Sequence, residues 1–114
     1  IVRREFEPIL ANVVESGDFV FTAGCIGDDT SLDVEGQTRM ALGDLDRYLA
    51  LCGSDKSRIL WAQIWVADIR LRDDMNKAWM AWVDPKNLPA RACTEAKMAD
   101  PRCLVEIQVV AVKG

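Results

Sequence analysis

The segment Val34–Cys52, VEGQTRMALGDLDRYLALC, decides how the chain can fold, because it predicts one long amphipathic helix. Asp33 is suited to cap the start of this helix, and Gly53 is suited to end it. A helix with one apolar stripe has to pack on another layer, so the neighbouring segments must supply a sheet. The stripe recurs with the helical period and consists of Val34, Ala41, Leu42, Leu45, Tyr48, Leu49 and Cys52.

Short segments that favour β-structure precede the helix. Residues 1–7 and 11–15 are two such runs, and Pro8 separates them. The turn sequence Ser16-Gly17-Asp18 leads into residues 19–22, which predicts a hairpin between the second and third runs.

One more strand, a second helix and two final strands follow the first helix. Residues 58–67, RILWAQIWVA, are rich in branched and aromatic side chains and predict a central strand. Residues 71–83 predict a second helix, which Asp84-Pro85 ends. Residues 91–98 and 104–112 predict the last two strands.

The order β-β-β-α-β-α-β-β predicts a single α+β domain, residues 1–114, with one sheet covered on one face by two helices. The last strand is apolar on both of its faces, which leaves the second face of the sheet without a cover. Self-association is the simplest source of that cover, so we expect a homo-oligomer.

Composition narrows the function classes. The chain is 50% hydrophobic and 28% charged, which is typical of a folded protein, and no apolar run is long enough for a membrane span. Its net charge of −4 opposes phosphate backbones and no basic patch is evident, so we expect no nucleic-acid partner. We expect a soluble, cytoplasmic protein that does not bind a membrane.

The absence of histidine excludes a Ser-His-Asp triad, a Cys-His pair and a histidine-ligated zinc site. Four cysteines without a CxxC pair favour free buried thiols over two disulfides. Any chemistry must then use carboxylates, arginine, backbone groups or a thiol.

Arg91 follows Pro89 at the entry to a strand, where its guanidinium could hold a substrate carboxylate through two parallel hydrogen bonds. The alternative is an exposed arginine, or one paired with Glu95. Glu106 lies in the middle of an apolar strand, where burial would raise its pKa and suit it to activate water. The alternative is a structural salt bridge, for example to Arg91.

Three other features are weaker candidates. Cys93 shares a strand face with Arg91, and we favour a backbone contact to a ligand over a thiol nucleophile. Asn76 in the second helix either bonds a loop or lies exposed. The four tryptophans favour a core or interface role over a stacking platform for bases.

Taken together, the segments TAGCIG (22–27), MNKAWMAWV (75–83), PARACTE (89–95) and LVEIQVVAV (104–112) resemble the YjgF/RidA family, also called the endoribonuclease L-PSP family. The resemblance extends from about Asn12 to Val112 and indicates a branch outside the archetypal RidA group. It implies a chorismate-mutase-like fold with a mixed sheet, assembled as a homotrimeric barrel with clefts between subunits.

The resemblance also implies an activity, the hydrolysis without metal or cofactor of enamines and imines such as 2-aminoacrylate to 2-keto acids and ammonia. Arg91 would bind the substrate carboxylate and Glu106 would position the water. Cys93, Asn76 and the Gly24–Cys25 segment would line or support the pocket. Small 2-imino or enamine carboxylates and a second copy of the chain are therefore the expected partners.

The chain departs from the family pattern on one wall of the implied pocket. Leu10 stands where archetypal members carry a tyrosine, and Ala23-Gly24-Cys25 replaces their Ser-Gly-Gln. Two rivals to the enzyme hypothesis therefore stay open. One is a trimer that binds carboxylate metabolites without catalysis, and the other is the ribonuclease or translation inhibitor of the older family label.

Overall fold

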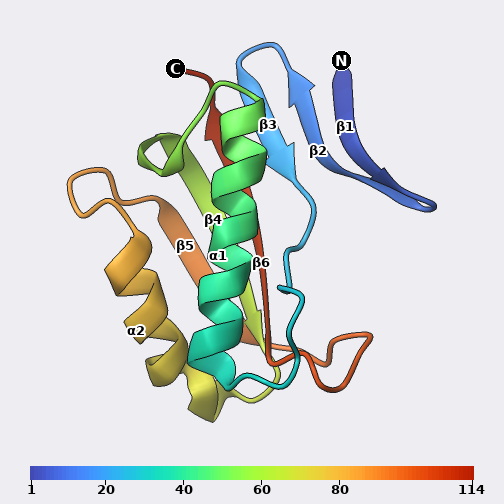
Figure 1. Ribbon diagram of the computed structural model, residues 1–114. Helices are drawn as coiled ribbons and strands as arrows, with labels where there is room; N and C mark the ends of the chain where they lie inside the picture. The colour runs from blue at the N-terminus through green and yellow to red at the C-terminus, as the bar shows by residue number, and fades with distance from the viewer.

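The computed structural model describes residues 1–114 as one sheet of six strands with two α-helices on one of its faces (Figure 1). Short 3-10 helices at Lys56–Arg58 and Ile69–Leu71 precede β4 and α2. The predicted element order and the single layer of helices are therefore confirmed. The elements are β1 (Val2–Glu7), β2 (Leu10–Ser16), β3 (Phe19–Thr22), α1 (Val34–Leu51), β4 (Ile59–Val66), α2 (Arg72–Trp82), β5 (Ala90–Glu95) and β6 (Val105–Val112).

The sheet is mixed, with the strand order β1-β2-β3-β6-β4-β5. The predicted β2–β3 hairpin is present, and every neighbouring pair is antiparallel except β4 and β5. The parallel pair requires a crossover, and α2 supplies it by running back over the sheet between β4 and β5 (Figure 1). The crossover places the start of β5 beside α2.

The first helix forms where its sequence predicts it. The Asp33 carboxylate accepts a hydrogen bond from the Gly36 amide at 2.8 Å, which satisfies one free N–H group of the first turn. At the other end Gly53 adopts the left-handed conformation with φ +70°, which stops the helix. The predicted apolar stripe is buried and packs on β3 and β6.

The core lies between the helices and the sheet. Alternate residues of the strands face this layer, including Ile64 and Val66 of β4 and Ile107 and Val109 of β6, all fully buried. The four cysteines are free, as predicted, and three of them are buried. Neither helix is long and apolar enough to cross a membrane.

The opposite face of the sheet carries apolar side chains that nothing in the chain covers. Phe21 of β3 lies beside Val110 of β6, which lies beside Trp61 of β4, so these three share that face. Phe19, Phe21 and Trp61 are 47%, 43% and 41% exposed. The predicted uncovered apolar face is confirmed, and we call it the open face.

The fifth strand is shorter than the sequence predicts. It ends at Glu95, whereas apolar and β-compatible residues had placed its end at residue 98. β4 ends at Val66, and the Ala96 amide donates to the Val66 carbonyl as the last bond of the pair. Beyond that point the segment has no strand to pair with.

Candidate functional site

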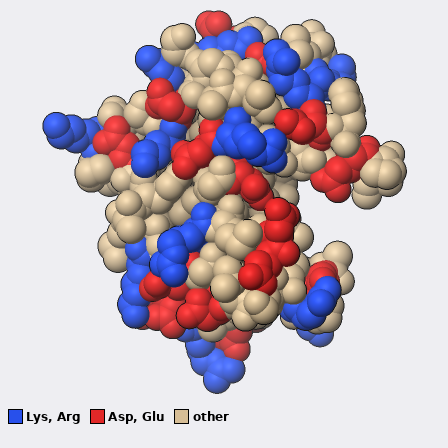
Figure 2. All heavy atoms as spheres, in the orientation of Figure 1, with Lys and Arg blue, Asp and Glu red and all other residues tan.

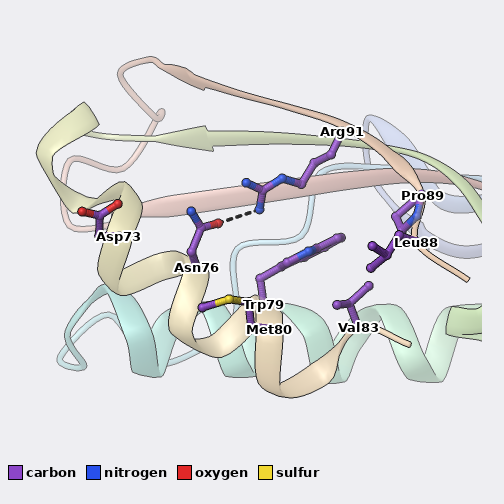
Figure 3. Close-up of a pocket in the computed structure, with 8 residues that line it drawn as sticks. All are labelled: Asp73, Asn76, Trp79, Met80, Val83, Leu88, Pro89 and Arg91. Atoms are coloured by element: carbon purple, nitrogen blue, oxygen red, sulfur yellow. Dashed lines mark hydrogen bonds between the residues drawn. The ribbon is translucent and has the colours of Figure 1, made fainter. Parts of the chain in front are cut away.

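Arg91 is held against α2 on the helix-covered side of the sheet. It lies beside the buried Ala62 of β4, so its side chain projects toward the helices. Its Nη1 donates a 2.7 Å hydrogen bond to Oδ1 of Asn76, and its guanidinium lies 5.3 Å from the centre of the Trp79 ring (Figure 3). Asn76 and Trp79 are three residues apart in α2 and therefore share one helix face.

The guanidinium of Arg91 has no carboxylate partner within the chain. Glu95, the predicted surface partner, instead accepts a hydrogen bond from the Ile69 amide at 3.0 Å. The pair with Glu95 and the salt bridge to Glu106 are therefore not formed within the chain, and Arg91 is half-buried rather than exposed. Burial lowers the pKa of Arg91, and the positive charge of Arg72 adds to this lowering. A half-buried, unpaired cation of this kind is suited to bind an anion.

A cavity of about 560 Å³ opens beside Arg91. Asp73 and Asn76 line one end of it, and Leu88, Pro89 and Val83 line the other (Figure 3). This volume is within the usual range for small-molecule sites. The sequence predicts a core or interface role for Trp79, as for the other tryptophans, and assigns Leu88 to no site. The spacing of three residues between Asn76 and Trp79 was the one available signal.

Cys93 lies two residues after Arg91 on the same face and is half-buried. Burial raises the pKa of its thiol, although the charges of Arg91 and Arg72 act in the opposite direction. A thiol with a raised pKa is a poor nucleophile near neutral pH. The structure therefore favours the interpretation of Cys93 as a packing residue.

Glu106 lies on the open face, where it pairs with Trp65 of β4. Its carboxylate makes no hydrogen bond or ion pair within the chain and is partly exposed. A Cβ atom placed on Gly24 would lie 2.7 Å from Cδ of Glu106, so a larger residue would require this carboxylate to move. Glu106 and the Gly24 segment are thus brought together.

Cys25 lies beside Ile107 of β6, whereas Leu10 lies in the β1–β2 hairpin. The Cys25 amide and carbonyl bond to Ile107 at 2.8 and 2.9 Å, which fixes the Gly24 segment against β6. The Cys25 side chain is buried, and burial raises the pKa of its thiol to about 12. Leu10 pairs with Glu7 in the β1–β2 hairpin and lines neither the Arg91 cavity nor the smaller cavity, of about 200 Å³, beside Gly24 and Cys25.

The predicted residues therefore form two separate groups. Arg91, Asn76 and Cys93 lie on the helix side at the β5 edge, and Glu106 lies with Gly24 on the other side of the sheet. These features define a class of small α+β domain with a mixed sheet, two helices on one face, an unpaired arginine at the sheet edge and an open apolar face.

The comparisons with known proteins agree with this class. The model of the endoribonuclease L-PSP family matches residues 7–113, so the chain belongs to this family, also called YjgF/RidA. A RutC family protein from Haemophilus ducreyi is 43% identical over 91 residues, covering 80% of this chain and 78% of the relative. The RutC family protein YoaB from Escherichia coli K12 is 36% identical over 111 residues, covering 97% and 96%.

Solved structures show the same fold. A member of the YjgF protein family from Neisseria meningitidis superposes with a TM-score of 0.96 at 36% identity, covering 99% of this chain and 94% of the other. A Mycobacterium tuberculosis member of the YjgF/YER057c/UK114 family gives a TM-score of 0.83 at 26% identity, covering 90% and 85%.

Proposed function

We propose that the chain hydrolyses 2-imino acids and their enamine tautomers to 2-keto acids and ammonia, in clefts between the subunits of a homotrimer. The observation that carries this proposal is the unpaired guanidinium of Arg91, oriented by Asn76 beside a cavity of about 560 Å³. In the proposed complex Arg91 binds the substrate carboxylate through its free N–H groups. Membership of the family supports the choice of reaction.

The reaction needs little from the protein beyond orientation. The imine carbon is already electrophilic, so a positioned water can form the new C–O bond while the C=N π electrons move to nitrogen. Glu106 accepts the proton that this water loses and returns it to the nitrogen. Glu106 then takes the proton of the new hydroxyl group and passes it to the nitrogen as the C–N bond breaks, so ammonia leaves and the keto group forms. No electron acceptor or donor is required.

Assembly is part of the proposal, because Arg91 and Glu106 lie on different sides of the sheet in one chain. Their side chains can face one substrate only if two copies meet. The open face supplies an apolar surface for that contact, with Phe19, Phe21 and Trp61 exposed. For the proposed homotrimer, a sizing experiment should give three times the chain mass of 12.7 kDa.

The activity is tested with an amino-acid oxidase that releases 2-imino acids while semicarbazide traps the imine that remains. The protein should slow semicarbazone formation, and Arg91→Ala should lower this effect about 100-fold or more, because two charge-assisted hydrogen bonds are lost. Arg39→Ala is the matched control, since its exposed guanidinium pairs only with Glu35 on α1. Full activity in Arg91→Ala would refute the mechanism.

The same preparation separates the two rivals. A metabolite-binding protein would show a higher Tm with a 2-keto acid while imines decay at the background rate. A ribonuclease would cleave RNA, which the net charge of −4 does not favour. On the face in Figure 2, Lys and Arg are interspersed with Asp and Glu, and no continuous basic surface is visible.

A further inference from the structure

We infer that the Arg91 cavity selects 2-imino acids with bulky apolar side chains, and that Leu88 is a main determinant of this preference. The inference deepens the proposed function and rests on it. It comes from the polarity of the cavity, whose charged groups lie at one end and whose other end is apolar.

The polar end fixes where a substrate carboxylate must lie. The Arg91 guanidinium points toward Asn76, and Asp73 lies beyond Asn76 at the same end (Figure 3). One carboxylate therefore meets the unpaired cation. A second carboxylate at this end would meet Asp73, whose negative charge disfavours it. The cavity suits a monocarboxylate.

The apolar end extends away from the guanidinium. Trp79 forms the floor beneath Arg91, and Leu88, Pro89 and Val83 lie at the far end of the ring (Figure 3). No charged side chain lines this end. A substrate held by its carboxylate would lay its side chain along the Trp79 ring toward Leu88, where only apolar contacts are available.

The size of the cavity also favours a substrate with a bulky side chain. A volume of about 560 Å³ has room for a branched or aromatic side chain besides the carboxylate. An imine with a one-carbon side chain leaves the apolar end hydrated. A branched or aromatic side chain displaces water from Trp79 and Leu88, and this gain favours the larger substrate.

Leu88 is suited to a test because it is 66% exposed, so its truncation should leave the fold intact. Leu51, on α1 and 45% exposed, lines no cavity and gives a matched control. The kcat/KM values are compared for imines made from leucine, methionine and phenylalanine, for the imine of alanine together with 2-aminoacrylate, and for the imine of glutamate.

The bulky apolar imines should exceed the small ones by about tenfold or more, and the glutamate imine should be the poorest. Leu88→Ala should reduce this advantage several-fold, mainly through a loss on the bulky imines, whereas Leu51→Ala should not change the ranking. An equal or reversed ranking in the unaltered protein overturns the inference, as does an equal loss on all substrates in Leu88→Ala.

A binding measurement distinguishes the proposed hydrolase activity from the inferred preference for apolar side chains. The Tm should rise more with 4-methyl-2-oxopentanoate than with pyruvate at equal concentration. If no imine is accelerated but this order holds, the proposed activity fails and the ligand class stands. If imines are accelerated and the order is reversed, the activity stands and the apolar preference is wrong.

Discussion

Arg91 and Glu106 lie on opposite faces of one sheet. Arg91 is beside Ala62 of β4 and Glu106 is beside Trp65, and residues three apart in a regular strand point to opposite sides. A site that uses both side chains on one substrate must therefore combine two copies of the chain.

This relationship predicts complementation between inactive variants. Arg91→Ala and Glu106→Gln should each lack activity, because every cleft loses one of its two groups. When the two variants are unfolded together, mixed in equal amounts and refolded, about a quarter of the clefts in a cyclic trimer regain both groups. The assay should recover about that share of the wild-type rate. Separately refolded variants, mixed afterwards, provide the control. No recovery in the co-refolded sample would show that the two residues do not share a cleft.

The contact between Gly24 and Glu106 predicts a second effect. Gly24→Ala would put a methyl group where the Glu106 carboxylate now lies, 2.7 Å from Cδ, and would force this carboxylate to move. A misplacement of about 1 Å can lower kcat about 100-fold, so we expect a loss of 10- to 100-fold. Gly43→Ala is the control, because nothing lies within 4 Å of its added Cβ on α1. It should keep full activity and raise the free energy of unfolding by about 1 kcal/mol. Equal activity in both variants would contradict the role of Glu106.

Asn76 predicts an effect on the orientation of Arg91. Asn76→Ala removes the 2.7 Å hydrogen bond to Nη1, which should lower kcat/KM about tenfold, mainly through KM. Asn76→Asp should be worse, because a carboxylate at this place pairs with the guanidinium and competes with the substrate. Asn87→Ala, which removes only a surface bond to Asp84, is the control. An Asn76→Asp variant more active than Asn76→Ala would contradict this account.

The sequence was sufficient for features that depend on local chemistry. The start and end of α1 follow from Asp33, Gly53 and the apolar stripe between them. Each of these signals depends on residues close to one another in the sequence. The predicted end of β5 was wrong, because this strand stops where its partner β4 ends. The two strands are more than 20 residues apart in the chain.

Some features of the candidate site could likewise be predicted from the sequence, and others could not. That Arg91 and Glu106 are unusual residues for their strands was visible in the sequence. The position of Arg91 over the Trp79 ring could not be predicted, because it depends on the crossover that brings α2 beside the start of β5. Leu10 lines neither cavity, so its place on the pocket wall stays a prediction.

Glu15, a buried carboxylate with two cationic partners, predicts how stability changes with pH. The buried carboxylate of Glu15 accepts hydrogen bonds from Lys113 Nζ at 2.8 Å and Arg4 Nε at 2.7 Å, which lower its pKa from 4.5 to about 2. The folded state therefore binds this proton less readily than the unfolded state. The contribution of Glu15 to the free energy of unfolding is complete above pH 4.5 and is lost as the pH falls toward 2.

Glu15→Gln removes this titration and leaves the side chain nearly the same size. The variant should be less stable than the wild type at pH 7, and the difference should shrink steadily between pH 4.5 and 2. Urea unfolding at a series of pH values measures both curves, and Glu35→Gln, at an exposed pair on α1, is the control. Parallel curves for Glu15→Gln and the wild type would show that Glu15 does not control stability in acid.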